Sequence, residues 1–406
     1  PHLWELSDLD NDGRADLRKS LSYGYGVRFS YTGHDMHGLA IGPDGKLYFS
    51  FGDRGANVRT QEGGVLAFPD EGAVFRCNLD GSQMEVVHSG LRNPQELAFD
   101  DFGNLFTGDN DCDNGDSERW VHVVEGGESG WRVGYQHAPL GKAGQWMSEK
   151  LWVPRFPGQA AYILPPVANI MDGPSGLTSN PGTGFPEKYA GQFFLTHFKG
   201  QASVSGISAI KLKPKGASFE LTSQEKFIWN CLPTDVDFGY DGSMYFTDWH
   251  HDWPKSSRGR IYRVYDPEAV QMKPVREVKT IFAEGFDHRS LDELSGLLAH
   301  KDRRVRMEAQ FAIVDQAFET IRNNSAPNRA RREINRLAQV ARRSPRQLAR
   351  LHGIWGLGQI AARHSGELKA IVKLLADKDA EVRAQTAKVL GDAGYANANK
   401  KLISRL

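Results

Sequence analysis

The chain has 406 residues, more than one compact core usually serves, so at least two domains are expected. Fifty Lys and Arg residues balance fifty Asp and Glu residues, and this zero formal net charge argues against a nucleic-acid binder. No apolar run reaches the ~18 residues that a helix needs to span a bilayer.

The first feature along the chain is an acidic loop. Three aspartates stand at alternate positions, a glycine follows them, and a fourth aspartate comes at the ninth position. This spacing resembles the start of an EF-hand loop, in which oxygen ligands wrap a hard cation. Position twelve is Lys19 instead of the usual Glu, so two interpretations stay open. One is a metal-free hairpin loop, and the other is a structural calcium loop with ligands Asp8, Asp10, Asp12 and Asp16.

One pattern then recurs three times, over 38–53, 96–109 and 235–248. Each copy is a short apolar strand, a tight turn with a glycine, and a second apolar strand that ends in Asp. Glycine supplies the positive φ of such a turn, and the aromatic and β-branched residues around it favour strands. Further strands are expected over 72–81, 206–213 and 259–265.

Many short strands with a repeated internal motif predict the blades of an all-β propeller over residues 1–268. A β-sandwich is the alternative fold, but it does not explain the repeat. The chain begins at Pro1 without a Met, so we expect a blade or more to precede it and the ring to be incomplete.

The composition changes after Pro267, where Leu, Ala and Arg replace Gly and aromatic residues. The segment 297–309 resembles 374–387, with Lys-Asp in the predicted turn and Val-Arg at the start of the second helix. The apolar spacing is helical, and one helix pair cannot bury its own stripe, so pairs must stack. We predict a linker over 269–288 and an all-α solenoid of the HEAT-repeat type over 289–406, which continues beyond the last residue.

Polar residues at strand ends would collect around the channel of a propeller. His34 precedes the first copy and could be a general base or a structural histidine. Arg92 and Asn93 precede the second copy, where the arginine could hold a carboxylate or tie neighbouring blades together. Lys199 follows the strand expected at 192–197. The acidic run 109–118 could hold calcium or be a solvated loop.

Several motifs resemble the soluble glucose and sorbosone dehydrogenases that depend on pyrroloquinoline quinone (PQQ) and are six-bladed propellers. They are a His eight residues before Gly-Pro-Asp-Gly at 42–45, Gly-Asp-x-Gly at 52–55, Arg-Asn-Pro-Gln at 92–95 and Gly-Gly-x-x-Gly-Trp at 126–131. Gly-His-Asp-Met-His-Gly-Leu at 33–39 and Thr-Asp-Val-Asp-Phe-Gly at 234–239 are similar to a planctomycete-type group of large membrane-bound dehydrogenases. In that group, HEAT repeats and usually a c-type haem domain follow the propeller.

The resemblance implies roles for individual residues. His34 matches the general base of the sugar dehydrogenases, Arg92 and Asn93 match residues that contact quinone and substrate, and Lys199 matches a quinone contact. The backbone carbonyls of Asp111 and Cys112 fall where the active-site calcium is held. One departure concerns the paired arginines that meet the quinone, because Leu232, Pro233 and Thr234 replace them.

The leading hypothesis is a quinoprotein-type oxidoreductase that oxidises a sugar or another alcohol. The hydroxyl proton would pass to His34 while hydride passes to calcium-bound PQQ, and electrons would go on to a c-type cytochrome domain outside this chain. The chain has no C-x-x-C-H motif and therefore no c-type haem site of its own. The resemblance also implies an exported, periplasmic or membrane-associated location.

Two alternatives belong to other classes. One is a non-catalytic propeller–HEAT scaffold that binds a glycan or a protein, with the helical array as a protein-binding surface. The other is a calcium-dependent propeller lactonase or other hydrolase that uses the acidic loop as its metal site. Retention of His34, Arg92, Asn93 and Lys199 favours the dehydrogenase, whereas loss of the paired arginines favours the scaffold.

Overall fold

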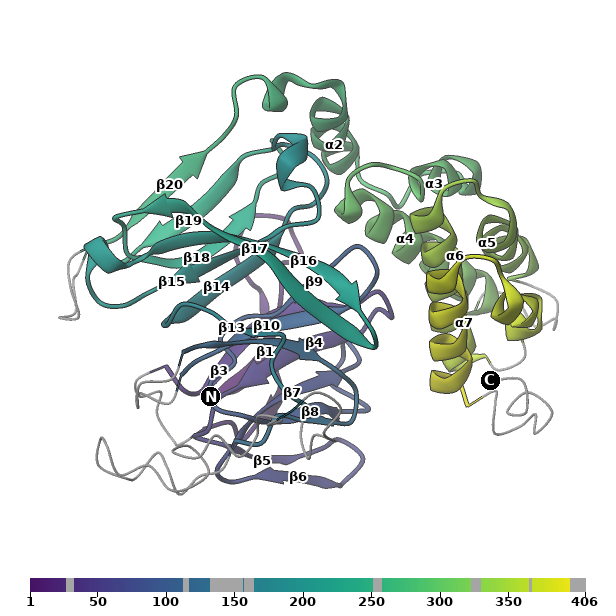
Figure 1. The fold of residues 1–406 in the computed structure, drawn as a ribbon. Helices are drawn as coiled ribbons and strands as arrows, with labels where there is room; N and C mark the ends of the chain where they lie inside the picture. The colour runs from purple at the N-terminus through teal and green to yellow at the C-terminus, as the bar shows by residue number, and fades with distance from the viewer. Residues whose placement is uncertain are drawn as a thin grey trace.

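The structure is a computed structural model, which describes residues 1–26, 33–111, 117–131, 156, 164–250, 258–322, 330–364 and 367–394. Strands form the part up to Val264, and helices form the part after it (Figure 1). None of the helices in these ranges is long and apolar enough to cross a membrane.

Four sheets of three to five strands follow one another along the chain. In order from the inner strand outward, the first sheet has β3 (Met36–Ile41), β4 (Leu47–Phe51), β7 (Gly72–Cys77), β8 (Glu85–Leu91) and β12 (Gly127–Glu128). The second has β9 (Ala98–Phe99), β10 (Leu105–Asp109), β11 (Arg119–Val123) and β13 (Ala168–Asn169). The third has β14 (Pro174–Ser179), β15 (Phe193–His197), β16 (Gly206–Lys215) and β17 (Ser218–Trp229). The fourth has β18 (Pro233–Phe238), β19 (Met244–Asp248) and β20 (Arg260–Val264).

Two hairpins flank the first sheet: β1 (His2–Ser7) with β2 (Leu17–Tyr23), and β5 (Ala56–Arg59) with β6 (Val65–Phe68). Separate apolar cores lie between neighbouring sheets. Phe106 and Trp120 of the second sheet, for example, pack with Phe193 and Leu195 of the third. The sheets therefore stack face to face in chain order, as blades do (Figure 1). Four such blades are described, and closure into a six-bladed ring stays a prediction.

The three sequence repeats are confirmed as the two innermost strands of three different sheets. Their turn glycines Gly45, Gly103 and Gly242 have φ of 75°, 80° and 78°, as such turns require. Glycine is also needed where inner strands meet. A Cβ on Gly38 would lie 3.0 Å from the Glu96 Cα, and one on Gly176 would lie 2.4 Å from the Asp235 Cα.

The third sheet repeats the same arrangement without the sequence pattern. Its inner strands β14 and β15 are antiparallel, but residues 180–192 and a short 3-10 helix (Glu187–Tyr189) replace the tight glycine turn. The second strand ends in His197 instead of Asp. Because both signals are altered, the sequence pattern did not reveal this blade.

The helical part contains α2 (Lys273–Glu284), α3 (Leu291–Leu297), α4 (Arg303–Arg322), α5 (Arg331–Arg343), α6 (Gln347–Arg363) and α7 (Ala380–Asp392). Short 3-10 helices lie at Ala269–Gln271, Glu367–Ala370 and Val372–Ala376, and another lies in the β-rich part at Ala202–Val204. The segment predicted as a linker therefore holds α2, because Val275, Val278 and Ile281 follow helical spacing and are buried. No strand follows Val264 in the described ranges.

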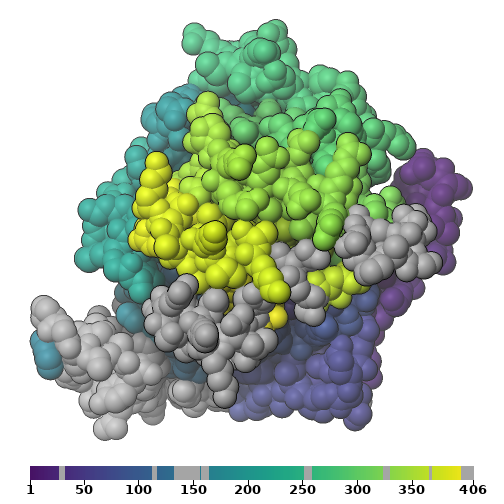
Figure 2. Space-filling model, turned by 90° about the vertical axis from the view of Figure 1, so that its right-hand side faces the viewer, coloured from purple at the N-terminus to yellow at the C-terminus, as the bar shows by residue number. Residues whose placement is uncertain are grey.

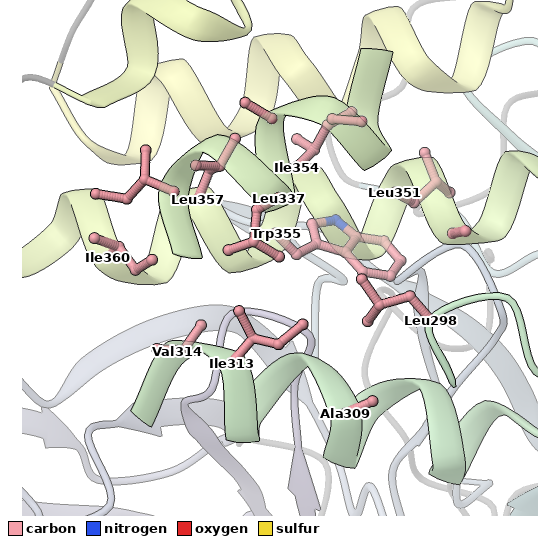
Figure 3. Close-up of a cluster of buried hydrophobic side chains, with 14 of the residues drawn as sticks. Leu298, Ala309, Ile313, Val314, Leu337, Leu351, Ile354, Trp355, Leu357 and Ile360 are labelled. Carbon is pink, nitrogen blue, oxygen red and sulfur yellow. The ribbon is translucent and has the colours of Figure 1, made fainter. Parts of the chain in front are cut away.

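Apolar side chains from several helices form one continuous core (Figure 3). Leu298 and Ile313 lie on one side of Trp355 and Ile354, and Leu337 of α5 completes the cluster. The predicted Lys-Asp turns are present, and Asp379 accepts the N–H groups of Glu381 and Val382 at the start of α7. The HEAT type itself stays a prediction.

The helices dock on the inner turns of all four sheets (Figure 2 views the molecule from the helical side). Gln310 donates to the Pro43 carbonyl at 2.7 Å, and Gln385 donates to the Phe102 carbonyl at 2.8 Å. Arg303 and Arg304 bond the third and fourth sheets at the carbonyls of Pro181 and Phe238. This docking covers the face opposite the strand ends that carry the predicted site residues.

Arg306 lies at the centre of this contact and is 1% exposed. Its guanidinium donates to Asp101 of the second sheet at 2.5 Å and to the carbonyls of His300 and Lys301 at 2.9 and 2.7 Å. His352 of α6 lies 3.3 Å from its Nε. The helical and β-rich parts are therefore joined by a buried, hydrogen-bonded cation.

Candidate functional site

The second strand of each sheet ends in a buried polar residue on the face away from the helices. These residues are Asp53, which follows β4 closely, Asp109 of β10, His197 of β15 and Asp248 of β19, with exposures of 1, 0, 0 and 6%. Equivalent pairings support the comparison, since Pro94, Pro174 and Pro233 oppose Asp109, His197 and Asp248 respectively. We call this set the strand-end rim.

His34 lies at this rim and is held by Asp53. Its Nδ1 is 2.8 Å from the Asp53 Oδ1, and the two side chains are 15% and 1% exposed. A carboxylate only accepts hydrogen bonds, so Nδ1 carries the proton and Nε2 presents its lone pair. Among the described residues, no hydrogen bond occupies that Nε2. The arrangement provides an oriented imidazole that can accept a proton.

Arg92 and Asn93 lie beside this pair. The Asp53 N–H donates to the Arg92 carbonyl at 2.6 Å, and a Cβ on Gly52 would meet both the His34 carbonyl and the Asn93 amide oxygen. Arg92 is 7% exposed, and its guanidinium carbon lies 5.7 Å from the centre of the Trp131 ring. The structure thus brings together residues from before the first and second repeats.

Lys199 lies on the third sheet, just after His197. Its Nζ is 2.8 Å from Asp172, and both side chains are about one-third exposed. The neighbouring His197 lies against the second sheet, because the Glu118 Oε2 lies 3.6 Å from the His197 Nδ1. Since exposed ion pairs contribute little stability, the Lys199 ammonium can exchange Asp172 for an anionic ligand.

Glu118 and His197 are both fully buried. Burial raises the pKa of Glu118 well above its usual range, and the charges of Asp172, Asp111 and Asp109 raise it further. Burial lowers the pKa of His197 to about 4. Burial therefore disfavours the charged form of both side chains at this contact.

Of the residues proposed as backbone calcium ligands, Asp111 lies directly after this rim, and its charge acts on Glu118. Cys112 lies outside the described residues. In the sequence, Asp53 stands only as the end of a repeat, and Asp109 stands as the end of a repeat and as the first residue of the acidic run 109–118 that could hold calcium. His197 was not singled out as a site residue. The signal for the two aspartates was their common place at the end of the repeat.

The fourth sheet differs from the other three at the rim. Leu232 occupies the position where the resembled dehydrogenases carry arginine; it is 3% exposed and donates its N–H to Asp248 at 2.7 Å. The Thr234 hydroxyl bonds that of Thr247 at 2.7 Å. Arg92 and Lys199 carry the positive charge that a carboxylate-bearing quinone would attract, whereas Leu232 offers none.

The acidic loop near the start of the chain joins β1 to β2. Ligand oxygens of Asp8, Asp10 and Asp16 can lie within 4.8 Å of one another, and all three residues are exposed. The Asp12 carboxylate instead accepts the Arg14 N–H at 2.8 Å. This loop belongs to an outer hairpin, so calcium there would be structural, and its binding stays a prediction.

Glu96 lies on the inner side of the second sheet, beside Gly38 of the first. Burial raises its pKa from the ordinary 4.5 to about 8, with a contribution from Asp235. Between those pH values the unfolded chain loses the proton first, so the folded state loses stability as pH rises. We expect the difference in melting temperature, Glu96→Gln minus wild type, to increase as the pH rises from 5 to 9. Glu62→Gln is the control, because the pKa of exposed Glu62 is lowered. Parallel wild-type and Glu96→Gln profiles would contradict this prediction.

Known proteins resemble parts of this chain. Quinoprotein glucose dehydrogenase B of Acinetobacter calcoaceticus is 30% identical over 128 residues, covering 24% of this chain and 26% of the relative. The chain thus spans about a quarter of that relative's length. A crystal structure of glucose dehydrogenase matches 65% of this chain and 72% of its own, with 18% identity and a TM-score of 0.44. The apo form of the soluble aldose sugar dehydrogenase from Escherichia coli matches 64% and 76%, with 16% identity and a TM-score of 0.41.

These proteins are what the β-rich part is similar to. The chain itself is assigned by a family model that covers the whole β-rich part. That model is described as "Domain of unknown function (DUF7133)" and matches residues 1–268, so the chain belongs to the DUF7133 family.

Proposed function

We propose that the β-rich part is a quinoprotein-type oxidoreductase module that oxidises a sugar or another alcohol. The observation that carries the proposal is the His34–Asp53 pair, a histidine held at 2.8 Å by a buried carboxylate beside Arg92 and Asn93. Similarity to quinoprotein glucose dehydrogenase B supports the reaction class.

In this proposal His34 accepts the hydroxyl proton of the substrate at Nε2. Asp53 holds the Nδ1 proton, which fixes the tautomer and stabilises the imidazolium that forms. Because Asp53 is 1% exposed, water competes little for that carboxylate, and the pair keeps one orientation. A base with this geometry contributes roughly 10²–10⁴-fold to a rate.

Arg92, Asn93 and Lys199 would hold the cofactor. Arg92 and Lys199 supply the cations that a carboxylate-bearing quinone needs, and Asn93 supplies an amide. When bound, such a quinone supplies the two-electron acceptor for hydride from the carbinol carbon. Calcium at the Asp111–Cys112 backbone, transfer of electrons to a c-type cytochrome domain, and an exported location are parts of the same proposal.

The helical part belongs to the proposal as a HEAT-type array. One face of it is occupied by the sheets, through Gln310, Gln385 and Arg306. A protein partner of the array would therefore bind on another face.

A non-catalytic scaffold is the second candidate, and the observation that favours it is Leu232. A buried leucine stands at the strand-end rim where the resembled dehydrogenases carry an arginine that meets the quinone. A scaffold needs neither an oriented histidine nor a quinone. Binding of PQQ therefore separates the two candidates.

The test is a titration of PQQ into the full chain with calcium present. We expect Lys199→Ala to weaken binding by roughly 10–100-fold, because one charge-assisted contact is lost. The turnover number at saturating PQQ should change little. Lys211→Ala, on the exposed outer part of β16, is the matched control and should bind as wild type does. Equal binding by all three proteins would mean that Lys199 does not contact the quinone, and no binding by wild type would favour the scaffold.

A further inference from the structure

Asp109 has contacts that the proposed reaction does not use directly. It is fully buried at the end of β10 and accepts the N–H groups of Asn93 and Arg92 at 2.7 and 3.0 Å. Its other oxygen contacts the guanidinium of Arg119, which stands opposite Asp109 on β11. One side chain of the second sheet thus holds two consecutive peptide groups.

The segment that it holds is fixed at its carbonyls as well. The Arg92 carbonyl accepts from the Asp53 N–H at 2.6 Å, and the Asn93 carbonyl accepts from the Asn110 N–H at 3.3 Å. With the backbone N–H and the carbonyl of both residues bonded, the directions in which the two side chains leave the backbone are set. Orientation of this kind matters because a displacement of about 1 Å can cost a reaction on the order of 10²-fold.

The fourth sheet contains the same kind of strand-end aspartate, but the residue whose N–H it binds is different. Asp248 ends β19, accepts the Leu232 N–H at 2.7 Å, and has Arg260 opposite it at 3.7 Å. Leu232 is apolar and buried, so this copy holds no residue that could contact a substrate or a quinone. The chain therefore provides an internal control in which the strand-end aspartate is structural only.

We propose that Asp109 is a positioning residue that aims Arg92 and Asn93 at the substrate and cofactor. This role rests on the proposed function. It means that the strand-end aspartate has a functional role in the second sheet and only a structural role in the fourth. Asp53 acts on the His34 side chain, whereas Asp109 acts through the backbone of the two residues that follow β8.

The test compares Asp109→Ala with Asp248→Ala in two backgrounds. One is the wild-type chain, and the other is the double variant that carries both Arg92→Ala and Asn93→Ala, the double-alanine background. In the wild-type background, Asp109→Ala should lower kcat/KM and PQQ affinity on the order of 10²-fold. In the double-alanine background it should lower neither further, because the side chains that it aims are gone. Asp248→Ala should leave both readouts near the values of the background in which it is made, although both aspartate variants lower the melting temperature.

Equal losses for Asp109→Ala and Asp248→Ala, or an undiminished loss in the double-alanine background, would overturn the positioning role alone. A wild-type chain that neither retains PQQ nor turns over would overturn the proposed function and this role with it. If Asp109→Ala does not fold, Asp109→Asn keeps the size and one acceptor oxygen. That variant should then show a smaller loss than Arg92→Ala with Asn93→Ala, and a loss of the same size as that of Asp248→Asn would contradict the role.

Discussion

Replacement of His34 by Ala is expected to lower kcat by roughly 10²–10⁴-fold in the chain loaded with PQQ and calcium. The affinity for PQQ should change little, because His34 acts on the hydroxyl proton of the substrate. The measurement is turnover with a saturating sugar or alcohol and an artificial electron acceptor. Added imidazole should restore part of the lost rate, since it can replace the missing base.

His37 provides the matched control in the same segment. It lies at the start of β3, its Nε2 is 2.7 Å from the Gly33 carbonyl, and burial lowers its pKa. His37→Ala should keep most of the turnover. If the two alanine variants lose turnover equally, or imidazole restores neither, His34 is not the base.

The second large effect concerns stability. Arg306→Met is expected to cost about 3–5 kcal/mol of the free energy of unfolding, because it breaks a buried ion pair and leaves a carboxylate and two carbonyls without their donor. Asp101 is one-quarter exposed, so water compensates part of the loss and the lower end of the range applies. Urea denaturation of the full chain measures it.

Lys301→Met is the control for that experiment. Lys301 precedes the same helix and pairs with Glu187 at 3.3 Å, but both side chains are more than half exposed. Such a pair contributes about 0–1 kcal/mol, so the variant should unfold close to wild type. An Arg306→Met protein as stable as Lys301→Met would mean that the helices and sheets are not joined through this network.

Three of the four sheets could be predicted from the sequence because the tight turn between their inner strands requires a glycine. Gly45, Gly103 and Gly242 all need a positive φ, and each lies between two apolar strands. The third sheet has no such turn, since its inner strands are joined by residues 180–192. That longer connection brings the Pro181 carbonyl to Arg303 of α4, so it serves the contact between the two parts of the chain.

The sequence predicted the residues that would contact substrate or cofactor, but not the residues that orient them. His34, Arg92 and Asn93 carry chemistry that a motif reveals, and the structure brings them together. The groups that orient them are Asp53 and the peptide-holding Asp109, whose roles depend on pairing between strands. The docking of the helices was invisible for a similar reason, because Gln310, Gln385 and Arg304 donate to backbone carbonyls, which every residue type has.

The most direct measurement for the central claim is anaerobic reduction of PQQ bound to the full chain. The chain is incubated with PQQ and calcium, desalted, and mixed with a panel of aldoses and simple alcohols while the quinone absorbance is followed. The account predicts that the quinone is retained on desalting and that at least one substrate bleaches it stoichiometrically in wild type but not in His34→Ala. A quinone that is lost on desalting, or that no substrate bleaches, would contradict it.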